Sequence, residues 1–502
     1  MFAIALAALL ATPATVALHP GASQTVAVDG ANGELTVSAQ NALVDASANG
    51  TSVTITATGA TGRDVVHVTD AAGAVLDVPV WVALDAAVVP AALIVRVTGQ
   101  PLDPQWLAAQ VSAAATEALT VQPGAGDASA SPPPMPLPRP GASAVAAVPV
   151  HVAGNGTYFD VDASVNVTIE NVAAEPFAPP LLMYDDDPER VEADGVLYRG
   201  TLDDQTPRRL YYYHDGGSTP HRLAVVLSAD GAPADVQIID ASAGPSLDVL
   251  SVGHAVTRNF LAMDAANEGR VLTVAPGTPL VLHDVLLGPR VGAAGNVDLQ
   301  ILNGGPVHVT VLSVPPGGDP LAELALPPLP GDGHHRSGLF DLTNYGTRSL
   351  AYAVGDPDLR VVYGDRDLTP PNAVPGGPGH DYGDYGVTQT FLFSLRNPTA
   401  EPAIVYLYER PIGGVVRSTF LVDGRLAQVG CVRDPAQRYQ IGAYSLAPGV
   451  AYLMRVDTMT DGSSSYPIEI GVTTTPPEPQ APPISAADGC FPKTGTRSTR
   501  NF

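Results

Sequence analysis

The sequence predicts a mostly β, multidomain protein: a compact N-terminal β module, a small α/β module and two antiparallel β-sandwich-like domains. Three observations indicate this class. Glycine and proline occur 50 and 49 times in 502 residues, which suits short strands joined by turns. Apolar and polar residues alternate in many short segments. Strand candidates also recur about every 8 to 15 residues, with turn signals between them.

The first 17 residues predict a secretion signal. Phe2 to Leu10 form an apolar run, and Thr15-Val16-Ala17 is a small-residue cleavage site. The alternative is a buried N-terminal strand. We see no later apolar run long enough for a membrane-spanning helix. The expected location is therefore secreted, periplasmic or at the cell surface.

Residues 18–84 predict the compact β module. The stretch "TSVTITATG" alternates strictly and places Val53, Ile55 and Ala57 on one face of a strand. Two further strands follow around a turn that ends at Gly73. The pattern resembles the small bacterial immunoglobulin-like modules, including the one that precedes pilus secretins. The resemblance implies an immunoglobulin-like sandwich.

Residues 85–172 predict the small α/β module. After the strand "ALIVRVTG", Asp103 can cap a helix that has Pro104 in its first turn. The apolar face of that helix is expected to contain Leu107, Val111, Ala114 and Ala118. The Pro-rich stretch 131–141 predicts an extended loop, because proline is excluded from strand and helix interiors.

The remaining chain predicts two β-sandwich-like domains, residues 173–330 and 331–475, separated by the turn-rich stretch "PPLPGDGH". Both contain pairs of strands joined by polar turns, as in "VVLSADGAPADVQII". Residues 476–502 are rich in proline and are expected to form a disordered tail.

The net charge restricts the partners. The chain has 50 acidic against 25 basic residues, a formal charge of −25. Nucleic acids and anionic membranes attract basic surfaces, so the charge argues against both. An extracellular protein or a polysaccharide is the expected partner.

Cys431 and Cys490 are the only two cysteines. In an exported protein they can form one disulfide that ties the tail to the last domain. Two unpaired thiols are the alternative, because the sequence does not report their separation in space.

The stretch "LYYYHDGGSTPH" concentrates reactive side chains. In a strand, Tyr211 and Tyr213 share one face while Tyr212 and His214 share the other. The sequence Asp215-Gly216-Gly217 supplies positive φ values for a tight turn. The favoured interpretation is a decorated β-hairpin. The alternative is a ligand site that adds Ser218 and His221 to His214 and Asp215.

Two other loops could bind ligands. "YDDDPE" (184–189) offers oxygen ligands that suit Ca²⁺, although a solvated acidic turn is the favoured interpretation. In "GHDYGDYG" (379–386), His380, Asp381 and Asp384 could meet a metal, and the two tyrosines could stack on a sugar ring. Ca²⁺ is the one cofactor that these loops suggest.

No catalytic motif of a metalloprotease, P-loop enzyme or dinucleotide enzyme is present, so no catalytic residue is assigned. The candidate ligand residues share a position in or beside Gly-rich turns: His214, Asp215, His254, His380, Asp381 and Asp384. We expect a ligand site to use such loops and not the sheet interiors.

Several motifs occur together between residues 173 and 475: "DDPERVEADGVLY", "LYYYHDGGS", "AGPSLDVLSVGHAVTRNFL", "GDYGV", "RNPT" and "TMTDGSSSYP". This region resembles a family of large secreted bacterial proteins of unknown function, which supplies no catalytic residues. The predicted function is a secreted or cell-surface structural or adhesive protein without catalytic activity. The alternatives are a carbohydrate- or metal-binding protein, or a hydrolase acting on polysaccharide or peptidoglycan.

Overall fold

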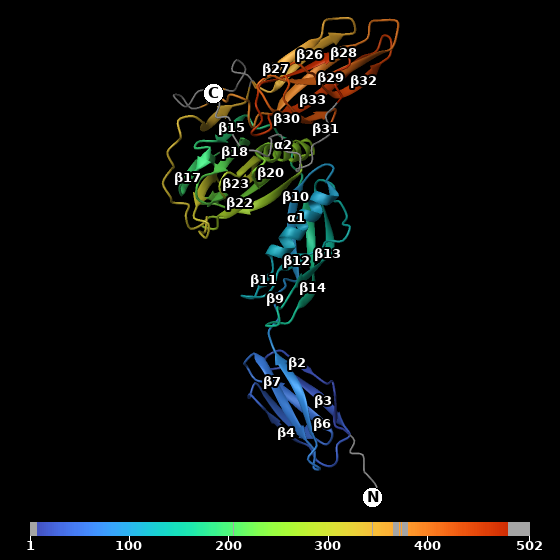
Figure 1. Ribbon diagram of the computed structural model, residues 1–502, viewed down its shortest axis with the longest axis vertical. Helices are drawn as coiled ribbons and strands as arrows, with labels where there is room; N and C mark the ends of the chain where they lie inside the picture. Colours follow the sequence, from blue (N-terminus) through green and yellow to red (C-terminus); the bar gives the residue numbers. More distant parts are fainter. Residues whose placement is uncertain are drawn as a thin grey trace. The chain divides into compact units, whose positions relative to one another are not determined.

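The computed structural model describes residues 8–203, 205–343, 345–364, 371, 373 and 380–479 (Figure 1). Over these residues the chain is mostly β and contains two α-helices, which confirms the predicted fold class. Neither helix is long and apolar enough to cross a membrane. The chain divides into two compact units.

The boundary between the units crosses the α/β module. The first unit comprises Met1–Val95, Asp103–Pro138 and Ala142–Glu170. The second comprises Arg96–Leu102, Arg139–Gly141 and Asn171–Phe502.

The first unit begins with a two-sheet sandwich, the N-terminal sandwich. One sheet has the order β1 (Leu10–Thr12), β3 (Ser23–Asp29), β6 (Ser52–Ala57), β5 (Val44–Asn49). The other has the order β2 (Val16–Leu18), β8 (Val75–Val82), β7 (Gly62–Thr69), β4 (Thr36–Ala39). Lettered along the chain, these are sheets ABED and A′GFC, which is an immunoglobulin-like topology. The predicted alternation holds, because Val53, Ile55 and Ala57 are all buried in the core.

Residues 10–18 belong to this sandwich. β1 pairs antiparallel with β3, and β2 pairs parallel with β8. The side chains of Leu9 and Val16 are buried in the core. These strands match the alternative expectation of a buried N-terminal strand. Cleavage after Ala17 stays a prediction, and it would remove β1 and most of β2.

The rest of the first unit is a small α/β module. Asp103 caps α1 (Pro104–Glu117) and accepts hydrogen bonds from the backbone N–H groups of Gln105 and Trp106 at 2.7 and 2.8 Å. The buried face of α1 contains Leu107, Val111 and Ala115, with Ala115 in place of the predicted Ala114 and Ala118. The strands are β9 (Ala87–Val88), β10 (Ala92–Thr98), β11 (Thr120–Val121), β12 (Ala128–Ala130), β13 (Ala142–Val152) and β14 (Val161–Asn171). The Pro-rich stretch 131–141 contains neither helix nor strand.

The second unit begins with the central sandwich. Its larger sheet has the order β21 (Gly269–Val274), β20 (Ala234–Ser246), β23 (Gly292–Gly304), β18 (Arg208–Gly216), β15 (Leu181–Asp185) and β25 (Ser337–Asp341), with β16 (Arg190–Val191) beside β18. The smaller sheet has the order β17 (Gly195–Leu202), β24 (Val307–Val314), β19 (His221–Ala229), β22 (Leu280–Leu287). Leucine, valine and isoleucine side chains from both sheets form one shared core.

The predicted hairpin at "LYYYHDGGSTPH" is wrong. β18 pairs with β15 and β23 in the larger sheet, whereas β19 pairs with β22 and β24 in the smaller sheet. The glycines serve close packing and not positive φ. A Cβ on Gly216 would lie 1.9 Å from the carbonyl oxygen of Gly288, and a Cβ on Gly217 would lie 2.4 Å from that of Val191. The stretch is a crossing between two sheets.

The second helix, α2 (Val249–Ala265), was not expected within a β-sandwich-like domain. Asp248 caps it, and buried apolar residues then recur every three or four positions, at Val249, Val252, Val256 and Phe260. One side of α2 packs on Tyr211 and Tyr213 of the larger sheet. Figure 1 shows α2 between this sheet and the strands that follow, and α2 contacts β30 and β33.

The C-terminal sandwich completes the second unit. One sheet has the order β26 (Thr347–Ala353), β28 (Gln389–Arg396), β33 (Ala451–Met459), β30 (Val416–Val422), β31 (Arg425–Val432). The other has the order β27 (Leu359–Tyr363), β34 (Ile468–Thr473), β29 (Ala403–Pro411), β32 (Tyr439–Leu446). The strand Ser337–Asp341, expected to belong to this region, pairs with β15 of the central sandwich.

Candidate functional site

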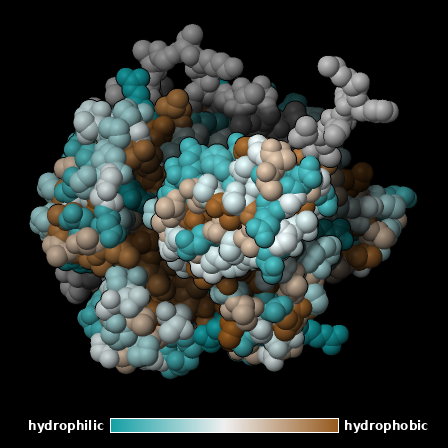
Figure 2. Space-filling view, turned by 90° about the horizontal axis from the view of Figure 1, so that it is seen from below, coloured by the Kyte–Doolittle hydropathy of each residue, from teal (hydrophilic) through white to brown (hydrophobic). Residues whose placement is uncertain are grey.

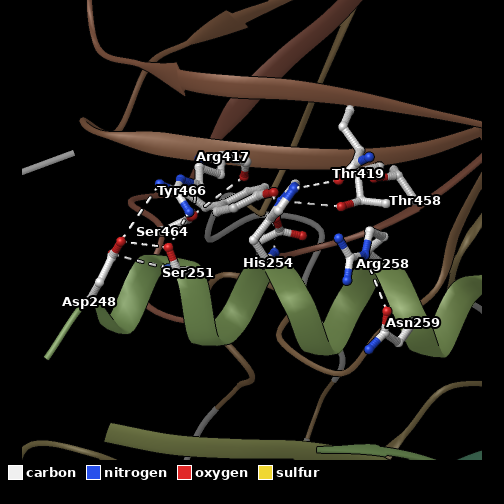
Figure 3. A network of polar contacts seen from close by, with 12 residues as sticks. Asp248, Ser251, His254, Arg258, Asn259, Arg417, Thr419, Thr458, Ser464 and Tyr466 are labelled. Carbon is white, nitrogen blue, oxygen red and sulfur yellow. Dashed lines mark hydrogen bonds and ion pairs between the residues drawn. The ribbon is translucent and has the colours of Figure 1, made fainter. Parts of the chain in front are cut away.

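A group of polar contacts lies where α2 meets the C-terminal sandwich (Figure 3). We call it the α2 interface, formed by Asp248, Ser251 and His254 of α2 with Arg417, Gln428 and Asp461 of the C-terminal sandwich. The helical spacing of three residues brings the three α2 side chains onto one side of the helix. They point toward the strand that carries Arg417 and Thr419 (Figure 3).

His254 is the centre of this interface. Its Nδ1 lies 2.6 Å from Oδ2 of Asp461, and its Nε2 lies 2.9 Å from Oε1 of Gln428. The hydroxyl of Thr419 is 3.3 Å from Nδ1. Burial disfavours the charged ring, but the Asp461 carboxylate and the two hydrogen bonds outweigh burial and raise the pKa of His254 above its ordinary value.

Arg417 forms a second connection between α2 and the sandwich. Its guanidinium donates to the hydroxyl of Ser251 and lies 3.7 Å from the carboxylate of Asp248. Asp248 in turn accepts from the hydroxyl of Ser251 at 2.5 Å. The Arg417 side chain is only 6% exposed, so the neighbouring carboxylate balances a buried charge.

The backbone of α2 touches the loop after β33. A Cβ on Gly253 would lie 2.0 Å from the carbonyl oxygen of Gly462. Only glycine at position 253 permits this approach. The motifs "SVGH" and "TDGSSS" therefore meet in space.

Two buried carboxyl groups lie close to these contacts. Glu409 on β29 is fully buried, and neither carboxyl oxygen makes a hydrogen bond of good geometry to the described residues, although the Ser418 hydroxyl lies near it. Burial raises the pKa of Glu409 to about 8, and the Ser418 hydroxyl opposes this only in part. Burial also raises the pKa of Asp461, against the effect of His254. Glu409 and Asp461 repel each other when both are ionised.

The other predicted ligand residues lie elsewhere. His214 is fully buried inside β18, with Nε2 3.2 Å from Asp185 and Nδ1 3.0 Å from the carbonyl of Pro188. Asp215 accepts a hydrogen bond of 2.9 Å from the hydroxyl of Tyr213. The expectation that these residues lie in loops is wrong for His214, which is in a sheet interior, and for His254, which is in a helix.

The "GHDYGDYG" loop is partly buried. His380 is exposed, and its ring lies 6.2 Å from that of Tyr382. Asp384 is buried and accepts from the amide of Gly364 at 3.0 Å and from Gln389 at 2.9 Å. Asp381 is fully buried, and neither carboxyl oxygen makes a hydrogen bond to the described residues. Burial and the charge of Asp384 raise the pKa of the Asp381 carboxyl group well above its ordinary value.

The six predicted residues do not converge on one metal site. Among the residues that the structure describes, no group of three or more His, Cys, Asp or Glu side chains is arranged to hold a metal ion. Cys431 lies on β31, whereas Cys490 lies outside the described residues, so their pairing stays a prediction.

Sequence reasoning missed a general pattern. At least nine of the eleven histidines lie within 3.2 Å of an aspartate or glutamate oxygen of the described residues: His19, His67, His151, His214, His221, His254, His283, His308 and His335. The sequence does contain a signal for this pattern, which is its single lysine. Histidine and arginine must therefore supply nearly all the basic partners of 50 acidic groups. Arg417, Glu409 and Asp461 gave no local signal, because their partners are distant in sequence.

Comparison with known proteins shows no relatives by sequence. No protein-family model and no curated protein matches the chain. Among solved structures, the I-band fragment I67–I69 of titin matches at 9% identity and a TM-score of 0.15, over 41% of this chain and 77% of that one. Lac15 from a marine microbial metagenome matches at 11% identity and a TM-score of 0.11, over 90% and 89%.

An endo-fucoidan hydrolase of glycoside hydrolase family 107 matches at 12% identity and a TM-score of 0.14, over 54% of this chain and 42% of that one. TM-scores this low carry no argument about function. The case for a function therefore depends on the chain's own residues.

Proposed function

We propose that this chain is a structural or adhesive protein that acts outside the cell or at its surface, without catalytic activity. The observation that carries the proposal is that potentially reactive histidine side chains make hydrogen bonds within the fold. Both ring nitrogens of His214 and of His254 face intramolecular oxygen atoms. These imidazoles hold structural elements together.

A catalytic histidine must reach its substrate within hydrogen-bonding distance. The His214 side chain is 0% exposed and that of His254 is 15% exposed. Neither meets this requirement without a rearrangement of the strands around it. The same contacts stabilise a multidomain chain, which a structural role demands.

Location and partners follow from composition. The charge of −25 and the immunoglobulin-like sandwich suit an exported protein that binds an extracellular protein or polysaccharide. Figure 2 shows apolar and polar residues intermixed over the face that it presents, and both kinds can contribute to adhesive contact.

Antibody labelling of intact and lysed host cells tests the location. We expect labelling of intact cells, or protein in the medium. Labelling that requires lysis would contradict the proposal.

Calorimetry tests the structural role of the histidines. We expect H214A and H254A to lower the melting temperature, with no change in the response to Ca²⁺, Zn²⁺ or an oligosaccharide panel. Loss of a wild-type binding signal in either variant would instead assign that histidine to a ligand site.

A metal-binding role is the second candidate, and Asp381 favours it. Its carboxyl oxygens are buried without hydrogen bonds to the described residues, and Ca²⁺ binds such oxygens. A Ca²⁺ titration of wild type, of D381N and of the exposed control D162N tests this role. Binding that only D381N abolishes would favour a cation at Asp381, and unchanged binding in D381N would exclude it.

A further inference from the structure

We propose that the α2 interface is a pH-responsive latch, which is closed while His254 carries a proton on both ring nitrogens and loosens at alkaline pH. This inference goes beyond the proposed function and does not depend on it. It rests on the position of one imidazole between two oxygen acceptors from different parts of the C-terminal sandwich.

The acceptors define the closed state. Oδ2 of Asp461 and Oε1 of Gln428 lie 2.6 and 2.9 Å from the two ring nitrogens of His254. A neutral imidazole has one N–H, so it can donate to only one of them. Deprotonation thus removes one charge-assisted hydrogen bond, unless the Gln428 amide turns over to donate to the bare nitrogen. Either outcome weakens the connection across the interface.

The surrounding charges do not replace the lost proton. The charged and titratable groups around this contact are Asp248, Arg258 and Asp264 on α2, Glu409 on β29, Arg417 on β30, Arg455 and Asp457 on β33, and Asp461 and Tyr466 after β33. Arg417 is already beside Asp248. Arg455 is paired with Asp457 at 2.8 Å. The Thr257 side chain and Arg417 also favour the charged form of Asp461, but His254 contributes the most to it.

The direction of the effect follows from the two shifted groups. The pKa of His254 is raised above 6.5, so its contribution to stability is complete below pH 6.5 and is lost as pH rises through the folded value. The pKa of Glu409 is raised from 4.5 to about 8, so its burial becomes more unfavourable between these values. As pH rises the interface loses the positive charge of His254, and above about pH 8 Glu409 adds a negative charge.

The close packing makes this change consequential. Gly253 and Gly462 approach so closely through their backbones that α2 and the loop cannot shift independently while the contact is closed. Weaker hydrogen bonding at His254 is therefore expected to let the helix and the loop separate. Loosening is thus expected in α2 and in residues 460–466, and not in the N-terminal sandwich.

Hydrogen–deuterium exchange of the full chain between pH 6 and 9, with exchange times scaled for the intrinsic effect of pH, tests the latch. Peptides covering α2 and residues 460–466 should exchange about tenfold faster at pH 9 for each unit by which the folded pKa of His254 exceeds its value in the open state. Peptides covering β3 and β6 serve as the internal reference.

Variants assign the effect to its groups. H254Q should exchange fast in these peptides already at pH 6 and lose the part of the pH dependence that comes from His254. H254Q/E409Q should show a smaller dependence still, which comes from Asp461 and from Asp264, whose pKa burial raises to about 7. H308Q is the matched control, because His308 pairs with Asp230 at 2.8 Å away from the α2 interface, and it should behave as the wild type.

Wild-type exchange that does not change between pH 6 and 9, or an H254Q variant with the full wild-type dependence, would overturn the latch. If H254Q fails to fold, the ring of His254 is titrated by NMR in the wild type. A midpoint above 6.5 that coincides with the exchange transition supports the latch, and a midpoint at or below 6.5 overturns it.

Discussion

The N-terminal sandwich and the α2 interface use carboxylates in opposite ways. In the sandwich, Asp64 accepts hydrogen bonds of 2.8, 2.9 and 2.8 Å from the amides of Asn41, Leu43 and Val65. Burial opposes ionisation of Asp64, but the amides together outweigh it and lower the pKa. At the α2 interface Glu409 has no such donors, and burial raises its pKa to about 8.

The difference shows that the donors around a buried carboxyl group decide its response to pH. The depressed pKa of Asp64 stabilises the sandwich above pH 3.8, and this contribution is lost as pH falls through the folded value. The raised pKa values of His254 and Glu409 act in the other direction, because they destabilise the α2 interface as pH rises. One chain thus contains an acid-sensitive region and an alkali-sensitive region.

The largest effect on stability is expected from removal of residues 1–17, a deletion that disrupts the N-terminal sandwich. The deletion removes β1 and most of β2, with the buried Leu9 and Val16. Burying two such side chains contributes roughly 4 kcal/mol, so the sandwich should lose about that free energy of unfolding. Denaturant unfolding of the full and shortened chains measures it. Equal stability would show that these residues are not part of the core.

The next largest effect on stability is expected from G253A, which disrupts the α2 interface. The added methyl group collides with the carbonyl of Gly462, so α2 must move away from the loop. A forced shift of packed backbone costs about 3 kcal/mol. The matched control is G288A, whose Cβ meets no atom within 4 Å. The account fails here if the two variants unfold alike.

A smaller effect is expected from D64A. The substitution leaves the amides of Asn41 and Leu43 without their acceptor, which costs roughly 2 kcal/mol. The loss should be present at pH 7 and should shrink as pH falls below 3.8, because Asp64 of the unfolded chain then takes up a proton. Denaturant unfolding at pH 3 and 7 measures this loss. D45N is the control, because the Asp45 side chain on β5 is exposed. An equal loss of unfolding free energy at pH 3 and 7 would show that the contribution of Asp64 does not depend on its ionisation.

The sequence predicted what depends on local pattern. The alternation at Val53, Ile55 and Ala57 and the cap at Asp103 were both correct, because each depends on neighbours in the chain. The helix that contains His254 was not predicted, although Asp248 and the following three- and four-residue spacing indicate one. The hairpin predicted at "LYYYHDGGSTPH" was wrong because Gly216 and Gly217 indicate a turn, whereas in the structure they permit close backbone packing.

The α2 interface could not be predicted in the same way. His254 meets Asp461 across 207 positions of the sequence, and Ser251 meets Arg417 across 166. No local periodicity connects such residues. Their types were visible, but their partners follow only from the packing of α2 against the C-terminal sandwich.

The most direct test of the opposite pH responses uses the chain's own chromophores. Both tryptophans, Trp81 and Trp106, belong to the first unit, whereas sixteen of the seventeen tyrosines follow Glu170. Thermal unfolding is recorded by tryptophan fluorescence and by near-ultraviolet circular dichroism of tyrosine between pH 4 and 9. We predict that from pH 6 to 9 the tyrosine transition moves to lower temperature while the tryptophan transition stays constant. Two transitions that fall together, or a tyrosine transition that rises with pH, would contradict the account.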